Sequence, residues 1–329
     1  AGPFAHQAAA RIPTKDCPMP DPVFSRLAII GAGLIGSSIA RGAREYGAAG
    51  EIVLYDANED VRARAAAIGL GTVAASLEAA VREADCVILC VPVGALGAAA
   101  AGAVPEMKGG AILTDVGSVK GEAARALAAA ADGRIHVIPG HPIAGTEQSG
   151  PEAGFATLFR GAWHILTPVE GPAPGADEAL ARLTAFWQAL GAKVETMDAG
   201  RHDRVLAITS HLPHLIAFNI VATAFDMETV EQGEVVKYSA GGFRDFTRIA
   251  ASDPVMWRDV FLNNREAVLE CLGRFSEDLA ALQRAIRWGD GDMLMREFTR
   301  ARTIRKAIID AGQDSASVNF GRNVPKAEE

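Results

Sequence analysis

Short apolar runs alternate with alanine-rich segments of helical spacing over the first two thirds of the chain. The apolar runs contain many β-branched residues and predict buried strands; they are "RLAIIG", "EIVLYD", "CVILCVP", "AILTDVG", "HVIPG", "WHILTP" and "AKVETM". Between them, "LIGSSIARGAREYG", "NEDVRARAAAIG" and "DEALARLTAFWQALG" predict helices. Strands that alternate with helices indicate βαβ units and a mostly parallel, doubly wound α/β sheet.

After residue 197 the strand pattern ends, and apolar residues recur at helical spacing nearly to the end of the chain. We therefore expect three parts: an N-terminal extension over 1–24, an α/β domain over 25–197, and a helical domain over 198–329. Long amphipathic helices with several apolar faces often pack against a second copy, so we expect the helical part to form a homodimer.

Composition narrows the class of protein. The chain has 329 residues, of which 49% are hydrophobic and 22% charged, with a formal net charge of −8. This balance does not suit a nucleic-acid-binding surface. We find no uninterrupted apolar run of about 18–20 residues and expect no membrane span. The four cysteines lack metal or redox spacing, so we expect a reducing, cytoplasmic location.

A glycine-rich turn between the first strand and the first helix has the G-x-G-x-x-G spacing, with Gly31, Gly33 and Gly36. Such a turn lets the backbone approach a pyrophosphate at a helix N-terminus, which predicts a Rossmann-type dinucleotide site. Leu34 and Ile35 lie between the last two glycines and are expected at the same site.

A carboxylate at the end of the second strand strengthens this prediction. Asp56 follows Gly36 by twenty residues, as a ribose-binding residue should. A carboxylate accepts hydrogen bonds from ribose hydroxyls and repels a 2′-phosphate, so NAD is favoured as the cofactor over NADP. Val91 and Pro92 follow a later strand and are expected at the same carboxyl edge of the sheet, where ligands bind in this fold.

A nicotinamide enzyme that oxidises an alcohol needs a base for the hydroxyl proton, and histidine is the usual choice. His141 is the strongest candidate, since it follows a predicted strand within "PGHPIAGTEQSG". His202, His211 and His214 lie in the helical part, where Pro213 should kink or restart the helix. His211 and His214 share a helix face, but no third ligand pattern accompanies them, so no metal is expected.

Five segments together resemble the prephenate/arogenate dehydrogenases of tyrosine biosynthesis. They are "GAGLIGSSIA", "DVGSVKG", "GHPIAGTEQSGPEAG", "SHLPHLIAFNIV" and "GGFRDFTRIAASDPVMWRDVFLNN", and they keep their order from about residue 26 to residue 285. The resemblance implies NAD-dependent oxidative decarboxylation of prephenate, of arogenate or of both. This reaction needs a base, a cation for a substrate carboxylate and a well-placed nicotinamide.

The resemblance also implies roles for single residues. His141 is the expected base, with Ser118 as its hydrogen-bonding neighbour near the hydroxyl and the nicotinamide. The expected substrate contacts are Arg248, His214, His202 and Trp257. We hypothesise that Glu147 and Asp245 pair with Arg248 when substrate is absent.

Alternatives remain open at this point. A β-hydroxyacid or 6-phosphogluconate-type dehydrogenase joins a similar cofactor domain to helices, and a dinucleotide-sensing protein without catalysis would keep the glycine turn. The sequence does not choose between prephenate and arogenate, and it does not show whether tyrosine inhibits the protein.

Overall fold

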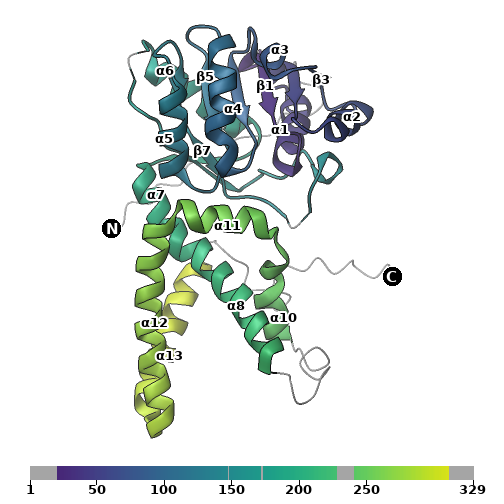
Figure 1. Ribbon diagram of the computed structural model, residues 1–329. Helices are drawn as coiled ribbons and strands as arrows, with labels where there is room; N and C mark the ends of the chain where they lie inside the picture. Colours follow the sequence, from purple (N-terminus) through teal and green to yellow (C-terminus); the bar gives the residue numbers. More distant parts are fainter. Residues whose placement is uncertain (1–20, 147, 172, 228–240, 311–329) are drawn as a thin grey trace. The chain divides into compact units, whose positions relative to one another are not determined.

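The computed structural model describes residues 21–146, 148–171, 173–227 and 241–310 (Figure 1). The chain divides into two compact units, Ala1–Val268 and Leu269–Glu329. The expected division at residues 24 and 197 remains a prediction.

The first unit contains a six-stranded sheet in which every neighbouring pair is parallel. Its order is β3-β2-β1-β4-β5-β6, so the chain winds outward in one direction from β1 and then returns to the other side at β4. Ligands bind at such a switch point in doubly wound sheets. The strands are β1 (Phe24–Ile30), β2 (Ala49–Tyr55), β3 (Thr72–Val73), β4 (Cys86–Leu89), β5 (Ile112–Asp115) and β6 (His136–Val137).

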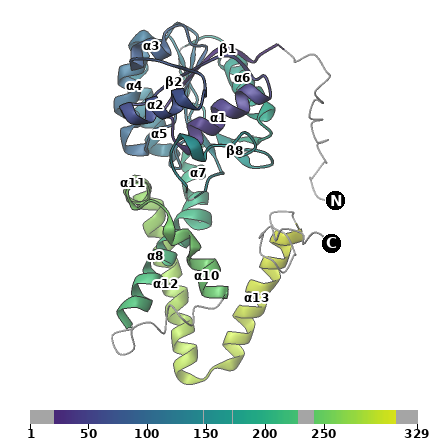
Figure 2. The ribbon, with the colours of Figure 1, turned by 90° about the vertical axis from the view of Figure 1, so that its right-hand side faces the viewer.

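Helices cover both faces of this sheet, which explains why its central strands carry buried apolar residues on both faces. Leu27 and Ile29 of β1 belong to one buried cluster, whereas Ala28 and Ile30 belong to the other. Residues of α1 (Leu34–Glu45), α2 (Glu59–Ala67) and α6 (Ala176–Ala189) complete the first cluster. The second cluster takes residues from α3 (Leu77–Val81), α4 (Leu96–Ala103) and α5 (Lys120–Ala130). Figure 2 shows α1 and α6 on one side of the strands and α3, α4 and α5 on the other.

A second, three-stranded sheet follows the first in the chain. Strand β8 (Trp163–Leu166) lies between β7 (Gly140–Pro142), which is antiparallel to it, and β9 (Lys193–Thr196), which is parallel. The hydrophobic pattern predicts these strands but does not show that they leave the main sheet. Short 3-10 turns occur beside both sheets: η1 (Val93–Ala95) and η2 (Val104–Glu106) lie between β4 and β5, and η3 (Pro151–Ala153) lies between β7 and β8.

From residue 198 onward, every described regular element is helical. The series begins with α7 (Ala199–Leu206), continues through a π-helical turn, η4 (Ala207–His211), and leads into α8 (Leu212–Met227). Pro213 lacks a backbone N–H, which accords with the altered helix just before it. The further elements are α10 (Gly241–Thr247), η6 (Arg248–Ala251), α11 (Pro254–Asn263), α12 (Arg265–Trp288) and α13 (Gly291–Asp310). The expected fold class is thereby confirmed.

One helical stretch, Ala199–Asp226, is long and apolar enough to cross a membrane by length and composition alone, with a mean hydropathy of 1.6. Polar residues such as Ser210, His214 and Asn219 interrupt it, so it is not an uninterrupted apolar run. Core helices of water-soluble proteins pass the same test. The stretch carries His202 and His211, which are fully buried and hydrogen-bonded within the first unit.

Candidate active site

The glycine turn has the geometry of a phosphate-binding loop. Gly31 has φ +101°, and a Cβ there would lie 2.4 Å from the carbonyl oxygen of Cys90. A Cβ at Gly36 would lie 2.0 Å from the carbonyl oxygen of Gly31, so the helix packs against the turn only with glycine at that position. A Cβ at Gly33 would meet nothing within 4 Å. Gly33 is also the N-cap of α1, without a side-chain cap, which leaves the first amides of α1 for a ligand.

Asp56 lies at the carboxyl end of β2 beside this turn. Its Oδ2 accepts a hydrogen bond from the backbone N–H of Ala32 at 2.9 Å, and its Oδ1 accepts one from Asn58 at 2.9 Å. The carboxylate is therefore fixed in orientation, with further acceptor positions on each oxygen. Arg62 lies close by and donates from Nη1 to the carbonyl oxygen of Asp56 at 2.7 Å, with its guanidinium over Tyr55.

The other predicted cofactor residues also lie in the first unit. Leu34 and Ile35 begin α1 directly after the glycine turn, and both are half-buried. Val91 and Pro92 follow β4, the strand beside β1, with Val91 half-buried and Pro92 exposed. The carboxyl ends of β1 and β4 meet at one sheet edge, as predicted.

His141 lies in the middle of the short strand β7, whereas the sequence pattern placed it just after a strand. It pairs with Ile165 of β8 and is half-buried. Its Nδ1 lies 2.9 Å from Nε2 of His202 on α7. The strand fixes the backbone of His141, and the second histidine fixes its ring.

The histidine pair continues into a carboxylate. Nδ1 of His202 donates to Oδ1 of Asp203 at 2.8 Å. Oδ1 of Asp203 also accepts from the backbone N–H of Lys120 at 2.7 Å, and its Oδ2 accepts from that of Gly121 at 2.8 Å. His202 thus has both ring nitrogens occupied, which argues against its expected role as a substrate contact.

Lys120 forms a second buried network behind His141. Its Nζ binds both carboxylate oxygens of Asp115 at 2.7 and 2.5 Å, and it donates to the carbonyl oxygen of Gly140 at 2.7 Å. Oδ1 of Asp115 accepts in turn from the N–H of Gly140 at 3.2 Å. A Cβ on Gly140 would lie 2.6 Å from Nε2 of His164, so this position also requires glycine.

Ser118 lies in the loop between β5 and α5 and is half-buried. The residues at the two ends of this loop, Asp115 and Lys120, both bind Gly140, the neighbour of His141. The loop of Ser118 therefore lies beside the segment of His141. The role of Ser118 as the hydrogen-bonding neighbour of His141 stays a prediction.

His214 and Trp257 form a stacked pair, with ring centroids 3.7 Å apart and 23° between the planes. Nδ1 of His214 donates to the carbonyl oxygen of Ser210 at 2.9 Å, which leaves its Nε2 as the acceptor nitrogen. Trp257 is buried and belongs to the apolar cluster of the sheet, together with Val93 of η1. Trp257 therefore anchors α11 to the sheet domain at the same time as it holds the ring of His214.

Arg248 begins η6 and is exposed, and its charge acts on His214. Asp245 lies one turn earlier on α10 and is half-buried. Glu147 lies outside the described residues. The hypothesis that Glu147 and Asp245 pair with Arg248 stays a prediction.

Burial dominates the protonation of the histidines around the site. It lowers the pKa of His141 well below the ordinary 6.5, and the neighbouring His202 and Lys120 lower it further. Burial also lowers the pKa of His202, partly offset by Asp203, and lowers that of His211 to about 4. His141 is consequently neutral at pH 7 and able to accept a proton.

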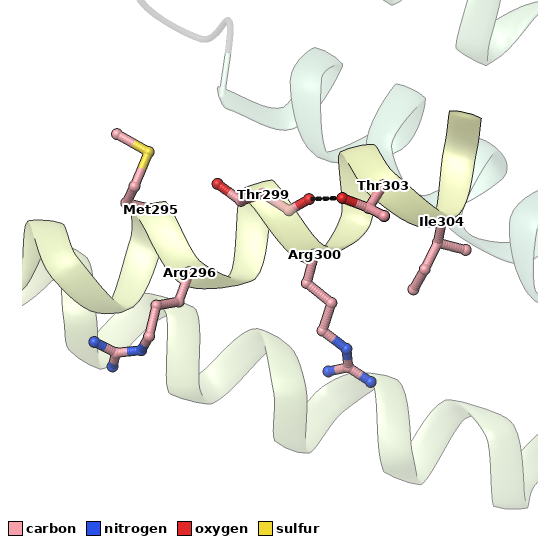
Figure 3. Close-up of a pocket in the computed structure, with 6 residues that line it drawn as sticks. All are labelled: Met295, Arg296, Thr299, Arg300, Thr303 and Ile304. Atoms are coloured by element: carbon pink, nitrogen blue, oxygen red, sulfur yellow. Dashed lines mark hydrogen bonds between the residues drawn. The ribbon is translucent and has the colours of Figure 1, made fainter. Parts of the chain in front are cut away.

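Figure 3 shows a cavity that is lined by other residues. It lies along α13 in the second unit and is lined by Met295, Arg296, Thr299, Arg300, Thr303 and Ile304. None of the predicted site residues contributes to it, and it lies on an exposed helix face.

The sequence interpretation missed four residues of this site: Asp115, Lys120, Asp203 and Asn264. Asn264 donates to the carbonyl oxygen of Asp203 at 2.9 Å and lies 3.0 Å from Nδ1 of His211. Asp115 and Lys120 stand in "DVGSVKG" and Asp203 follows His202, so the motifs contained them. Their partners are distant in sequence, and no local pattern links them.

The first unit holds a dinucleotide-type turn and a half-buried, oriented histidine, a combination that defines a nicotinamide-dependent dehydrogenase acting on an alcohol carbon. Comparison with known families is more specific. Residues 39–196 match the prephenate dehydrogenase nucleotide-binding domain, and residues 198–300 match the prephenate dehydrogenase dimerization domain. The chain belongs to the prephenate dehydrogenase family, which decides against the β-hydroxyacid dehydrogenase alternative.

Individual relatives agree with this assignment. The cyclohexadienyl dehydrogenase of Zymomonas mobilis is 44% identical over 87% of this chain and 97% of its own. The prephenate dehydrogenase of Lactococcus lactis is 34% identical over 86% of this chain and 77% of its own. Among solved structures, Aquifex aeolicus prephenate dehydrogenase in complex with hydroxyphenyl propionate and NAD+ is similar with a TM-score of 0.79. It is 35% identical, over 86% of this chain and 98% of that one.

Proposed function

We propose that this protein catalyses the NAD-dependent oxidative decarboxylation of prephenate, arogenate or both, in tyrosine biosynthesis. The observation that carries the proposal is the position of His141. It is a neutral, oriented imidazole in a chain whose glycine turn and Asp56 form a dinucleotide site. The family and its named relatives support the same reaction.

The residues present fit NAD. The open space over Gly33 and the uncapped start of α1 suit a pyrophosphate, and Asp56 suits the two ribose hydroxyls. When bound there, NAD would supply a hydride acceptor for the carbon that bears the substrate hydroxyl. The Aquifex aeolicus relative was solved with NAD+, which supports this choice of cofactor.

His141 moves one proton in the proposed reaction. Its Nε2 accepts the hydroxyl proton as the hydride leaves C4, the ring carbon that bears the hydroxyl. This step gives a ring ketone. The bond then breaks between the carboxylate and C1, the ring carbon opposite C4. Carbon dioxide leaves, and the electron pair of the broken bond makes the ring aromatic. The resulting phenolate oxygen takes the proton back from Nε2, so His141 ends neutral. Ser118 is the proposed hydrogen-bonding neighbour of the hydroxyl.

The substrate carboxylates require cations or donors in a chain of net negative charge. Arg248 is the proposed partner of one carboxylate, because a guanidinium binds a carboxylate through two parallel hydrogen bonds. His214 lies within the electrostatic reach of Arg248 and is proposed as a second contact, with Trp257 holding its ring.

The second unit supports a homodimer. Large apolar side chains stand exposed on α12 and α13, among them Trp288 at 75%, Ile286 at 68% and Phe298 at 58%. Exposed apolar surface of this kind marks an interface, and the family model for this region is named for dimerisation. A cytoplasmic location accords with Cys86, Cys90 and Cys271, which are free thiols in this structure.

The test is a steady-state comparison of prephenate and arogenate, each with NAD and NADP, monitored by NADH or NADPH absorbance. Turnover of at least one substrate with NAD, with release of carbon dioxide, supports the proposal. Absence of turnover with both substrates would overturn it. Addition of tyrosine to the same assay shows whether the product inhibits.

A further inference from the structure

Three side chains form an unbroken line of hydrogen bonds that ends at the proposed base. The line runs from Asp203 through His202 to His141, with separations of 2.8 Å and 2.9 Å. All three residues belong to the first unit, but they come from α7 and from β7, 61 residues apart. This line is not needed for packing alone, since apolar side chains would fill the same space without any buried polar group.

The far end of the line is anchored on a helix start. Asp203 accepts from the backbone N–H groups of Lys120 and Gly121, the first two residues of α5. These amides have no partner within their own helix, and the positive end of the helix dipole favours a carboxylate. Burial raises the pKa of Asp203, but His202 and the two amides outweigh it and the pKa is lowered. The carboxylate is therefore ionised and able only to accept.

Because the carboxylate of Asp203 can only accept, it determines which ring nitrogen of His202 and of His141 carries a proton. His202 must donate from Nδ1 to Asp203, so a neutral His202 carries no proton on Nε2. Nε2 of His202 then accepts from Nδ1–H of His141. A neutral His141 with its proton on Nδ1 has the lone pair on Nε2, which is the nitrogen that faces neither His202 nor Asp203.

We propose that Asp203 is a positioning residue that sets, through His202, the tautomer and ring orientation of His141. This inference rests on the proposed function, in which Nε2 of His141 receives the hydroxyl proton. Asp203 does not touch the substrate and does not take the proton. When His141 becomes positively charged, the ionised carboxylate stabilises that charge through the polarised ring of His202. The same logic governs carboxylate–histidine pairs in unrelated hydrolases.

The central experiment replaces Asp203 by asparagine. The side-chain amide of Asn has a single acceptor oxygen, and the backbone N–H groups of Lys120 and Gly121 compete for it. The NH₂ group of this amide then faces Nδ1 of His202. In this variant His202 carries its proton on Nε2 and donates it to Nδ1 of His141. His141 must then carry its own proton on Nε2, the nitrogen that should accept the hydroxyl proton. We expect D203N to lower kcat by roughly 10²–10⁴-fold, with smaller changes in KM and in NADH affinity.

A matched control comes from the same helix. Asp198 is the N-cap of α7 and accepts from the N–H of Arg201 at 2.9 Å. Asparagine caps a helix as well as aspartate, so D198N removes the same charge from α7 without touching the line. D198N should keep wild-type kcat, and D203E, which retains an acceptor-only carboxylate, should recover part of the loss in D203N.

A second measurement does not depend on activity. The ¹⁵N chemical shifts of the imidazole nitrogens of His141, recorded without substrate or cofactor, report which nitrogen carries the proton. We expect Nδ1–H in the wild-type protein and in D198N, and a shift toward Nε2–H in D203N. If the wild-type protein turned over neither substrate, the proposed function would fail while this comparison still tested the positioning role.

A second pair of variants covers the case in which D203N does not fold. In H202Q, the amide oxygen can accept from Nδ1–H of His141 while its NH₂ donates to Asp203, so the tautomer of His141 is kept. In H202L it is not. H202Q should retain more turnover than H202L. Equal kcat in D203N and D198N, an unchanged tautomer in D203N, or equal loss in H202Q and H202L would each overturn the proposal.

Discussion

Nζ of Lys120 donates to the carbonyl oxygen of Gly140, the residue that precedes His141, at 2.7 Å. Lys120 and its partner Asp115 are both completely buried. Burial lowers the pKa of Lys120, and Asp115 and Asp203 partly offset this. The pair therefore holds the backbone of the proposed base in place, and each charge depends on the other.

Replacement of Lys120 by methionine should destabilise the protein by about 3–5 kcal/mol, because it leaves the carboxylate of Asp115 buried without its cation. Urea unfolding with NADH binding as a check of the fold measures this effect. The matched control is K108M, which breaks an ion pair with Asp85 that is partly exposed, with 37% of the Lys108 side chain accessible. Such a pair contributes only about 0–1 kcal/mol, so equal losses in both variants would contradict the expected role.

Replacement of His141 by asparagine tests the base. We expect turnover to fall by about 10²–10⁴-fold, the contribution of a positioned general base. The NH₂ group of asparagine can replace Nδ1–H of His141 as the donor to His202, so thermal unfolding and NADH affinity should stay near the wild-type values. Turnover that survived the change would show that another group accepts the proton.

Replacement of Asp56 by asparagine should weaken the preference for NAD over NADP. The carboxylate repels a 2′-phosphate, and a hydrogen bond to a charged group is worth about 1.5–3 kcal/mol. We therefore expect the ratio of kcat/KM for NAD to that for NADP to fall by roughly 10- to 150-fold. Arg62, on the carbonyl oxygens of Asp56 and Ala57, is positioned to meet the added phosphate.

The contribution of Arg62 is measured in the D56N background. There, R62A should remove the gain with NADP, whereas R64A should not. Arg64 lies on the same helix but pairs with Glu152. An NADP gain that persisted in R62A would assign phosphate recognition to another group.

Arg248→Lys tests the substrate cation. Lysine keeps the charge but loses the planar fork that binds a carboxylate through two bonds. KM for the substrate should rise by roughly 10-fold or more, with a smaller change in kcat, since a hydrogen bond to a charged group is worth at least about 1.5 kcal/mol. R244K on α10 is the control, because Arg244 is exposed and has no expected contact with the substrate. Equal KM values in the two variants would show that Arg248 does not bind the substrate carboxylate.

Local signals allowed much of the sheet domain to be predicted. Ile29 and Ile30 face opposite apolar clusters, so the run around them could only be a strand covered on both sides. Asn58 caps α2 by accepting from Asp60 at 2.9 Å, as its position before a helical pattern predicts. Such features depend on neighbours within a few residues.

The contacts that build the site depend on partners far apart in the sequence. His141 and His202 are 61 residues apart, and Lys120 and Asp203 are 83 apart. No periodicity carries information about such pairs. Trp257 shows the same limit, because its type and spacing fit a pocket wall and a core residue equally, and its place in the apolar cluster of the sheet appears only in three dimensions.

Acidification should destabilise the protein before its carboxylates are protonated. Burial lowers the pKa of five histidines below 6.5: His141, His164, His202, His211 and His214. Their pKa is lower in the folded than in the unfolded state, so the unfolded state binds more protons below pH 6.5. The free energy of unfolding should therefore fall from pH 6.5 toward pH 4, by at most about 1.4 kcal/mol per pH unit for each histidine.

Urea unfolding at several pH values between 7.5 and 4.5 measures this slope, and His164 provides the most direct test. It is completely buried and stacks on Trp187 with ring centroids 3.7 Å apart, and within the described residues neither of its ring nitrogens has a hydrogen-bond partner. Phenylalanine keeps an aromatic ring on Trp187 but cannot bind a proton. H164F should therefore show a shallower slope than the wild-type protein, by up to about 1.4 kcal/mol per pH unit. An identical slope in H164F would mean that His164 titrates alike in the folded and unfolded states, contrary to its burial.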